Sequence, residues 1–153
     1  MAVTCNDLDV VAAAKLSISA TLPATDDAAG YAALTFTDIE GITDLPSISG
    51  SYNDIPYDLV TDGTTCHKPG QFNPGSDTFN FARVLGKVGQ TLIKTQFDGK
   101  LSTAFKLAYS NGDIDYCVGY FQSIPAQNGT ADTVRSRACT VQWTRKPVEE
   151  PAP

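Results

Sequence analysis

The chain has 153 residues, of which 42% are hydrophobic and 18% are charged, and this balance is typical of a single globular domain. Its 17 acidic side chains outnumber 11 basic ones, giving a net charge of -6, which excludes a basic protein that holds nucleic acid through phosphate contacts. The N-terminus has no basic segment ahead of a long apolar run, and no stretch has the roughly 20 apolar residues of a membrane helix. We therefore expect a soluble protein that is made in a cytoplasm and does not contact a membrane.

The four cysteines do not predict a disulfide framework. They are Cys5, Cys66, Cys117 and Cys139, no two of them form a CxxC pair, and a chain of this length can build a core without bridges. Cys66 precedes His67 but has no further ligands at zinc spacing. We therefore expect free thiols and no metal site.

Alternating apolar and polar residues predict two strands in the first half of the domain, after an N-terminal arm at 1–14. The first strand is expected at 15–22 and is ended by a proline. Residues 25–30 predict a polar, acidic turn, and a second strand is expected at 32–40.

Residues 50–76 predict a long loop, because Gly, Pro, Asp and Asn crowd together there and most connections in compact domains are only about 4–6 residues long. The segment nevertheless carries apolar and aromatic side chains that need burial. We therefore expect it to become ordered against a neighbouring subunit. The residues expected at that contact are Tyr52, Asp54, Ile55, Tyr57, Leu59, Val60 and Phe72.

The middle of the chain predicts a strand followed by one helix. The strand is expected at 77–85, with Phe79, Phe81 and Leu85 on one face. The helix is expected at 87–98, where apolar residues repeat at helical spacing and Gly99 follows the last of them. Its apolar stripe is narrow, so the helix should flank the strands and cover one side of the core.

Two strongly alternating runs, at 101–109 and 113–124, surround Asn111-Gly112 and predict a β-hairpin. Asn-Gly favours a type I′ turn, which needs positive φ at both central positions. In the second run, Tyr120 is among the residues expected to face inward.

A last strand is expected at 132–145, which completes a domain spanning 15–146. Residues 147–153 are rich in proline and acid and predict a disordered tail. The predicted core residues are Leu92, Phe97, Phe105, Tyr116, Val141 and Trp143.

The sequence contains no recognisable catalytic constellation. Its single histidine, His67, has no serine or cysteine motif around it, and residues 86–89 lack the pattern of a phosphate-binding loop. We therefore expect no catalytic residues, no metal and no cofactor.

Several segments, taken in order, resemble the major tail tube proteins of siphovirus-type bacteriophages, which have long, non-contractile tails. They are the strand at 77–81 (DTFNF), the strand and turn at 105–112 (FKLAYSNG), the run at 120–124 (YFQSI) and the opening of the last strand at 133–137 (TVRSR). The segment from 36–41 into the long loop fits the same order of elements. No single motif is diagnostic, so the resemblance depends on the order of the elements together with the loop.

The resemblance implies a mainly β fold, an antiparallel β-sandwich with one short flanking helix and a long inter-subunit loop. Six subunits would form a ring whose inner strands join one β-barrel, and the rings would stack, bridged by the loop and the N-terminal arm. The resulting tail tube, assembled in the host cytoplasm as part of the virion, would conduct double-stranded DNA. Its implied partners are other copies of the chain, a tape measure protein in the lumen, and tail terminator and distal tail proteins.

Strands that join such a barrel should turn small polar residues toward the lumen, on the face opposite their apolar alternation. Merely solvent-exposed strand positions would have the same pattern. The residues nominated are Thr78, Asn80, Asp113, Asp115, Ser136, Thr140 and Gln142.

Three alternatives remain open from the sequence. A secreted or surface β-sandwich adhesin or carbohydrate-binding module would also be acidic and rich in strands. An enzyme on a jelly-roll scaffold would need clustered histidines or carboxylates. The tube protein of a contractile injection device would share the tail tube architecture.

Overall fold

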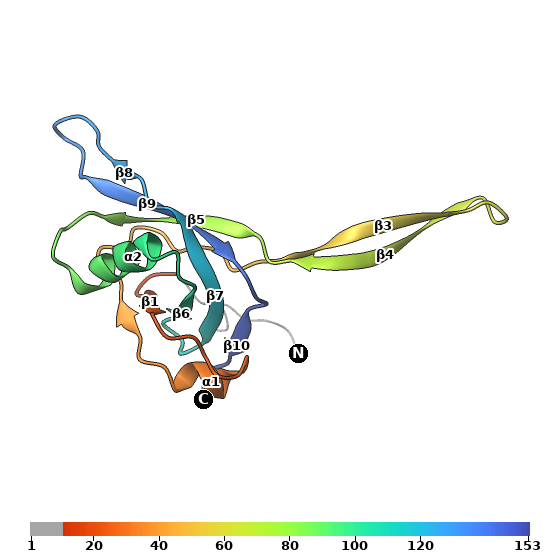
Figure 1. Cartoon of the computed structure of the whole chain (residues 1–153), viewed down its shortest axis with the longest axis horizontal. Coiled ribbons are helices and arrows are strands. Elements are labelled where there is room, and N and C mark those ends of the chain that lie inside the picture. The colour runs from red at the N-terminus through yellow and green to blue at the C-terminus, as the bar shows by residue number, and fades with distance from the viewer. Residues whose placement is uncertain (1–10) are drawn as a thin grey trace.

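The structure, a computed structural model that describes residues 11–153, consists of a body and a long hairpin that projects from it (Figure 1). Most of the predicted N-terminal arm lies outside the described residues. The mainly β, antiparallel fold is confirmed. The elements are β1 (Lys15–Ser19), α1 (Ala28–Ala32), β2 (Thr37–Asp38), β3 (Ser51–Leu59), β4 (Thr64–Asn73), β5 (Ser76–Ala82), α2 (Val88–Asp98), β6 (Thr103–Ala108), β7 (Ile114–Ser123), β8 (Ala126–Gln127), β9 (Ser136–Trp143) and β10 (Val148–Glu150).

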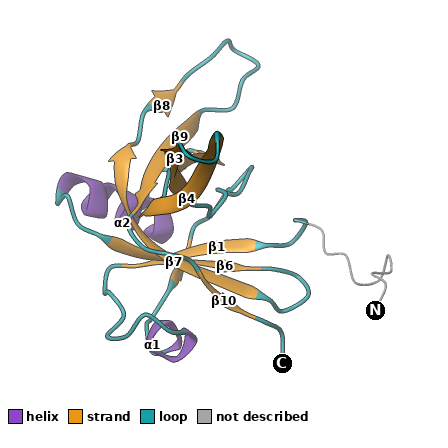
Figure 2. Cartoon of the chain, turned by 90° about the vertical axis from the view of Figure 1, so that its right-hand side faces the viewer, coloured by secondary structure: helices purple, strands orange, loops and turns teal. Residues whose placement is uncertain are grey.

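Eight of the strands form one antiparallel sheet in the body, in the order β2-β1-β6-β7-β9-β5. Figure 2 shows β1, β6, β7 and β10 of this sheet as neighbouring strands. β10 pairs with the first part of β7, and β8 pairs with β9. The strands β3 and β4 pair only with each other. The molecule therefore has a sheet that builds the body and a separate two-stranded ribbon.

The main core lies between one face of the sheet and a cover made of α2 and residues 39–48. The Phe105 ring packs edge-on against Trp143, with ring centroids 5.1 Å apart, and the Trp143 indole donates a hydrogen bond to the Ser47 carbonyl at 3.1 Å. Val141 is buried in the same cluster, and Leu92 and Phe97 of α2 pack against it while partly buried. The helix was expected at 87–98 and is observed at Val88–Asp98.

The opposite face of the sheet holds a second, smaller cluster. Tyr31 of α1 stacks on Tyr116 of β7, with ring centroids 4.9 Å apart, and Ala104 and Val118 complete the cluster. Strands β6 and β7 are therefore buried on both faces, which explains why several of their positions depart from simple alternation. Tyr116, a predicted core residue, lies here and not in the main core.

The helix α1 corrects the predictions of a turn at 25–30 and a strand at 32–40. The Asp27 carboxylate accepts a hydrogen bond from the Gly30 amide at 2.7 Å, which satisfies a free N–H of the first turn. Only Thr37–Asp38 pairs as a strand, next to β1. The predicted strand failed because the Asp27 cap and the packing of Tyr31 favour a helical turn.

The turn between β6 and β7 is also different from the prediction, although the hairpin itself is present. Gly112 has a φ of 98°, whereas Asn111 does not have a positive φ. The Tyr109 amide donates to the Asp113 carbonyl at 2.9 Å, so three residues form the loop. This is the three-residue loop with glycine at its end, which needs only one positive φ, and not a type I′ turn.

Three further predictions are wrong in the described structure. Val148–Glu150 forms β10 instead of a disordered tail, because Pro147 and Pro151 flank the ladder and leave its amides free to pair with β7. Leu85 is 73% exposed, since β5 ends at Ala82. Tyr120 is 39% exposed, because it pairs with Gln142 on the polar face of the sheet.

Candidate self-assembly site on the projecting hairpin

The predicted loop at 50–76 is instead the hairpin formed by β3 and β4. Its register pairs Ile55 with Lys68, Tyr57 with Cys66 and Leu59 with Thr64. At the turn, Gly63 has a φ of 61° and its amide donates to the Leu59 carbonyl at 2.9 Å. Strands of this length reach about 30 Å at the usual rise per residue, so the tip stands well clear of the body (Figure 1).

Side chains alternate along β3 between a largely apolar face, on which β4 also places Lys68 and Cys66, and a mainly polar face. Ile55, Tyr57 and Leu59 share the apolar face, where Ile55 is 51% exposed and Tyr57 is 65% exposed. Val60, in the turn, is 96% exposed. Exposed apolar residues arranged on one face of a protruding element indicate a contact with another molecule.

The polar side chains on the other face of the hairpin form hydrogen bonds with one another. The His67 ring lies 2.7 Å from the Asp54 carboxylate, and the Thr65 hydroxyl donates to Asp58 at 2.8 Å. Pro56 and Pro69 lie between these hydrogen-bonded pairs on the same face. The two faces therefore differ in that the exposed apolar side chains of β3 lie on one face and the hydrogen-bonded polar pairs on the other.

The base of the hairpin is clamped to the body by aromatic and cationic contacts. The Tyr52 and Phe72 rings meet at 5.3 Å, and the Lys146 ammonium lies 5.1 Å and 5.0 Å from their centroids. Lys146 also donates a hydrogen bond to the Tyr52 hydroxyl at 2.6 Å. A Cβ at Gly50 would lie 2.2 Å from the Phe72 ring, so glycine is needed there. These contacts hold the base of the hairpin against the body, and they do not extend to its distal part.

Prolines occupy both strands of the hairpin. Pro56 lies in β3 and Pro69 lies in β4, and each strand has a partner on one side only. Proline has no amide to donate and is tolerated only on such edge strands, where it also limits unwanted strand addition. The binding groups of the hairpin are thus its side chains more than its backbone edges.

The residues predicted for the inter-subunit contact all lie on this hairpin, but in three different settings. Tyr52 and Phe72 belong to the base clamp, Asp54 lies on the polar face, and the other four lie on the apolar face or the tip. The alternation of Ile55, Tyr57 and Leu59 with polar positions could have predicted β3. The many glycines and prolines outweighed that signal in the sequence analysis.

Most of the residues nominated for a lumen lie on one face of β5 and β9. Thr78 and Thr140 are cross-strand partners whose hydroxyl oxygens are 3.0 Å apart. The Gln142 side chain donates to the Gly75 carbonyl at 2.7 Å. Asn80 donates through its amide nitrogens to Asp44, and Ser136 donates to Gln127 at 3.2 Å. This surface is small, polar and well ordered.

The structure does not bring Asp113 and Asp115 to that surface. Asp113 lies in the β6–β7 turn and accepts a hydrogen bond from the Ala152 amide at 2.7 Å. Asp115 accepts one from the Tyr109 hydroxyl at 2.9 Å and pairs with Glu149 of β10. By alternation along β7, Asp115 and Tyr120 are on opposite faces. The two aspartates belong to an acidic region beside β10.

Few side chains in the described part of the chain are arranged as in a catalytic or metal-binding site. Within residues 11–153, no group of three or more His, Cys, Asp or Glu side chains is placed to hold a metal ion. None of the helices in the described part of the chain combines the length and apolar content needed to cross a bilayer. Burial raises the pKa of Cys117 to about 11 and that of Cys139 to about 12, so both thiols stay protonated and unreactive at neutral pH.

Comparisons with solved structures identify the fold. The chain superimposes on the SPP1 tail tube with a TM-score of 0.68, at 12% identity, covering 90% of this chain and 76% of that one. It matches a chain of the sheath–tube complex of PVC, an extracellular contractile injection system, with a TM-score of 0.65, at 14% identity, covering 95% and 93%. It matches the tail of an empty GTA particle with C6 symmetry with a TM-score of 0.59, at 15% identity, covering 86% and 92%.

No protein-family model matches the chain, and no curated protein matches it in sequence. The fold is nevertheless clear: it is the tail tube fold, shared by components of phage tails and of contractile injection systems. The similar structures are parts of tubes and not enzymes.

Proposed function

We propose that this chain is the tube subunit of a long, non-contractile phage tail, which polymerises as stacked rings of six and encloses a channel for DNA. The observation that carries the proposal is a tail tube fold with a hairpin whose apolar face stays exposed among residues 11–153. The fold favours this function over an adhesin or a carbohydrate-binding module.

The energetics support self-assembly through the hairpin. Burying an exposed apolar side chain of the size of Ile55 or Tyr57 contributes roughly 1.5–3 kcal/mol. A contact that buries Ile55, Tyr57 and Val60 together would therefore repay much of the entropy lost on association. A two-stranded ribbon is only marginally stable alone, so the contact would also stabilise the hairpin.

The number of subunits and the character of the channel follow from the same proposal. A sixfold ring is supported by the C6 symmetry of the GTA tail, which has the same fold. In such a ring the polar face of β5 and β9 lines the lumen, and Asp113 and Asp115 lie away from it. The net charge of -6 keeps the tube from binding DNA phosphates during passage.

The proposed partners are those of a tail under assembly in the host cytoplasm. A tape measure protein fills the lumen before DNA does, and terminator and distal tail proteins close the two ends. The finished tube belongs to the virion tail, a location supported by the SPP1 and GTA structures.

A second candidate function is the tube of a contractile injection device. The match to the PVC complex favours it, because that chain is covered to 93% and the SPP1 chain only to 76%. The two candidates differ in whether a sheath surrounds the tube. A sheath-protein gene beside the gene for this chain, and sheathed tubes by electron microscopy, would select the contractile device.

The test of tube formation is electron microscopy of concentrated purified protein, with sedimentation to measure the assembled fraction. We expect hollow tubes of regular diameter with sixfold end views. Replacing residues 51–75 with a short Gly-Ser linker should leave a folded body that stays monomeric. Tubes formed by this deletion variant would contradict the role of the hairpin, and discrete compact particles at every concentration of the full chain would contradict the function.

A further inference from the structure

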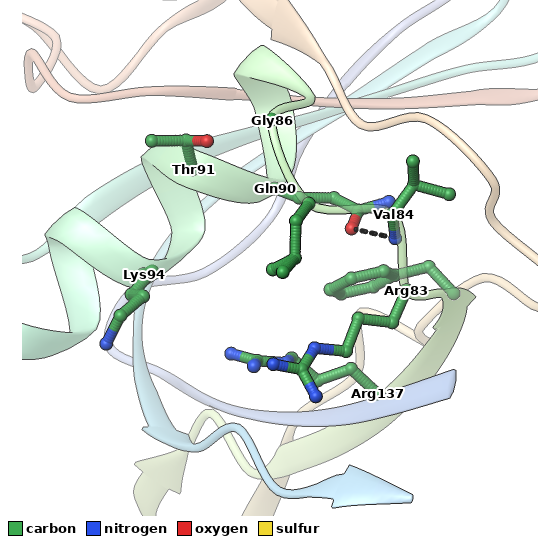
Figure 3. A pocket seen from close by; sticks show the side chains of 9 residues that line it. Arg83, Val84, Gly86, Gln90, Thr91, Lys94 and Arg137 are labelled. Atoms are coloured by element: carbon green, nitrogen blue, oxygen red, sulfur yellow. Dashed lines mark hydrogen bonds between the residues drawn. The ribbon is translucent and has the colours of Figure 1, made fainter. Parts of the chain in front are cut away.

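A hollow with three basic side chains lies at the end of β5 opposite the hairpin (Figure 3). The connection from β5 to α2 forms one wall, and β9 forms another. Arg83 follows β5 and its amide donates to the Arg135 carbonyl at 2.8 Å, while Arg137 pairs with Phe81 across the strands. The lining residues are Phe81, Arg83, Val84, Leu85, Gly86, Gln90, Thr91, Lys94 and Arg137.

One of the three cations, Lys94, is paired with Asp98 of its own helix at 3.1 Å, whereas the two arginines are not neutralised by the described part of their own subunit. The ion pairs among residues 11–153 join Lys15 to Asp38, His67 to Asp54, Lys94 to Asp98 and Arg145 to Asp26. Arg83 and Arg137 therefore have no acidic partner among the described residues. Their side chains point into the same space (Figure 3), and the Arg83 Nε is buried with no acceptor in that part of the chain.

Two guanidinium groups that share a hollow repel each other, and an uncompensated donor costs free energy when buried. An acidic ligand would offset the repulsion between the two guanidinium groups, and it would supply an acceptor for the buried donor. The hollow also has an apolar side, since Val84 is 47% exposed and Leu85 is 73% exposed. The ligand that fits best presents an apolar side chain flanked by carboxylates.

The tip of the hairpin has this composition. Val60 is 96% exposed, Asp58 precedes it by two residues and Asp62 follows it by two. Residues 57–64 contain no lysine, arginine or histidine. The tip therefore complements the hollow in both charge and polarity, although the chain as a whole is acidic.

The geometry excludes docking within one subunit. β5 runs from the base of the hairpin at Ser76 to Ala82, beside the residues that line the hollow, so the tip and the connection from β5 to α2 lie at opposite ends of the molecule (Figure 1). A contact between unlike surfaces of two copies is head-to-tail, and it repeats from copy to copy into rings or helical stacks. A second copy of the chain can therefore supply the tip that the hollow's own subunit cannot.

We propose that the hairpin tip of one subunit docks in the arginine hollow of the next, with Val60 against Val84 and Leu85 and with Asp58 and Asp62 facing Arg83 and Arg137. This inference rests on the proposed self-assembly through the hairpin and names its receptor. It requires only copies of this chain.

The test uses two full-length variants with reversed charges. The tip variant carries Asp58→Lys and Asp62→Lys, and the hollow variant carries Arg83→Glu and Arg137→Glu. Each alone should need at least about tenfold more protein to assemble than the natural chain, because each places like charges together. Mixed in equal amounts they should form tubes again, since the two surfaces of each variant match those of the other.

Folding is checked by circular dichroism and thermal unfolding. If the hollow variant does not fold, Lys94→Glu with Arg137→Glu replaces it and leaves Arg83 in place. Lys100→Glu, which reverses an exposed cation outside the hollow, is the control and should assemble normally.

The outcomes separate the two proposals. If the natural chain forms tubes and the folded hollow variant does so at the same concentration, the receptor is wrong and the tube function stands; this is also the result expected if the arginines bind nucleic acid. If both variants fail and the mixture fails too, the pairing of tip with hollow is overturned. If the natural chain never assembles, the proposed function fails and the docking with it.

Discussion

The body and the hairpin are both built from antiparallel strands, but they differ in where their apolar side chains go. In the body, Phe79 and Phe105 are fully buried and Trp143 is 1% exposed. In the hairpin, Ile55 and Tyr57 are more than half exposed, although they alternate as regularly as the core residues do. The body therefore buries its large apolar side chains within the described chain, whereas the hairpin leaves Ile55 and Tyr57 exposed.

The two regions also differ in what fixes their geometry. The sheet of the body is covered by α2 on one face and by α1 on part of the other. Among residues 11–153, the hairpin is held at its base, by Lys146 over the Tyr52 and Phe72 rings. The covered sheet of the body therefore carries a hairpin whose distal part is exposed to a neighbour. Four predictions test this difference between the two regions.

The largest expected effect on the free energy of unfolding comes from replacing one aromatic side chain by alanine in each region. Trp143→Ala should lower the free energy of unfolding by about 3–5 kcal/mol, because it leaves a cavity in the main core. Tyr57→Ala should change it by no more than about 0.5 kcal/mol, since the ring contacts little in the isolated subunit. Urea denaturation followed by far-ultraviolet circular dichroism measures both. A comparable loss in the two variants would show that the hairpin packs on its own body.

The apolar face of the hairpin should control assembly and leave the stability of the subunit unchanged. Ile55→Asn should raise the protein concentration needed for tube formation at least about tenfold, because the change removes apolar area from the contact. The matched control on the polar face, His67→Asn, should have a much smaller effect. Sedimentation of a concentration series compares them, and equal effects from the two faces would refute the assignment.

Alkaline pH should destabilise the body through groups that are buried as neutral species. Burial raises the pKa of Cys117 to about 11 and that of Tyr31, Tyr116 and Cys139 to about 12. The folded state then holds protons that the unfolded state has lost, so stability is present below about pH 9 and decreases as pH rises toward 12.

The slope of this decrease reaches about 1.4 kcal/mol per pH unit for each group involved. Urea denaturation at pH 8, 9.5 and 10.5 measures it, and Cys139→Ala should make the slope shallower by removing one group. A free energy of unfolding that stays constant over this range would contradict the burial of these groups.

The smallest expected effect is at the base of the hairpin. Lys146→Met removes the cation from the two aromatic rings, and such a contact contributes about 0.5–1 kcal/mol at an exposed site. Hydrogen exchange at the amides near Tyr52 and Phe72 should become about two- to fivefold faster. Lys146→Arg retains the charge and should preserve most of the protection. Equal exchange in all three proteins would show that the clamp does not hold the base.

Much of the body could be predicted from local patterns. The spacing of apolar residues predicted α2 to within one residue of its observed bounds, and alternation placed β6, β7 and β9. These signals are local, because the period of a helix or a strand appears within a few turns or pleats of the chain. The same reasoning missed α1, for which Asp27 as an N-cap was an available signal.

The sequence by itself determined the mainly β character of the chain, its single long helix and the apolar content of residues 50–76. Only the tertiary structure decided that this segment is a projecting ribbon, that β10 pairs with β7, and that Asp113 and Asp115 are separated from the polar face of β5 and β9. The physical reason is that alternation identifies which side of a strand is apolar, whereas the partner that covers that side depends on contacts between residues far apart in the chain. For the hairpin and the arginine hollow, the proposed contacts lie in a second subunit.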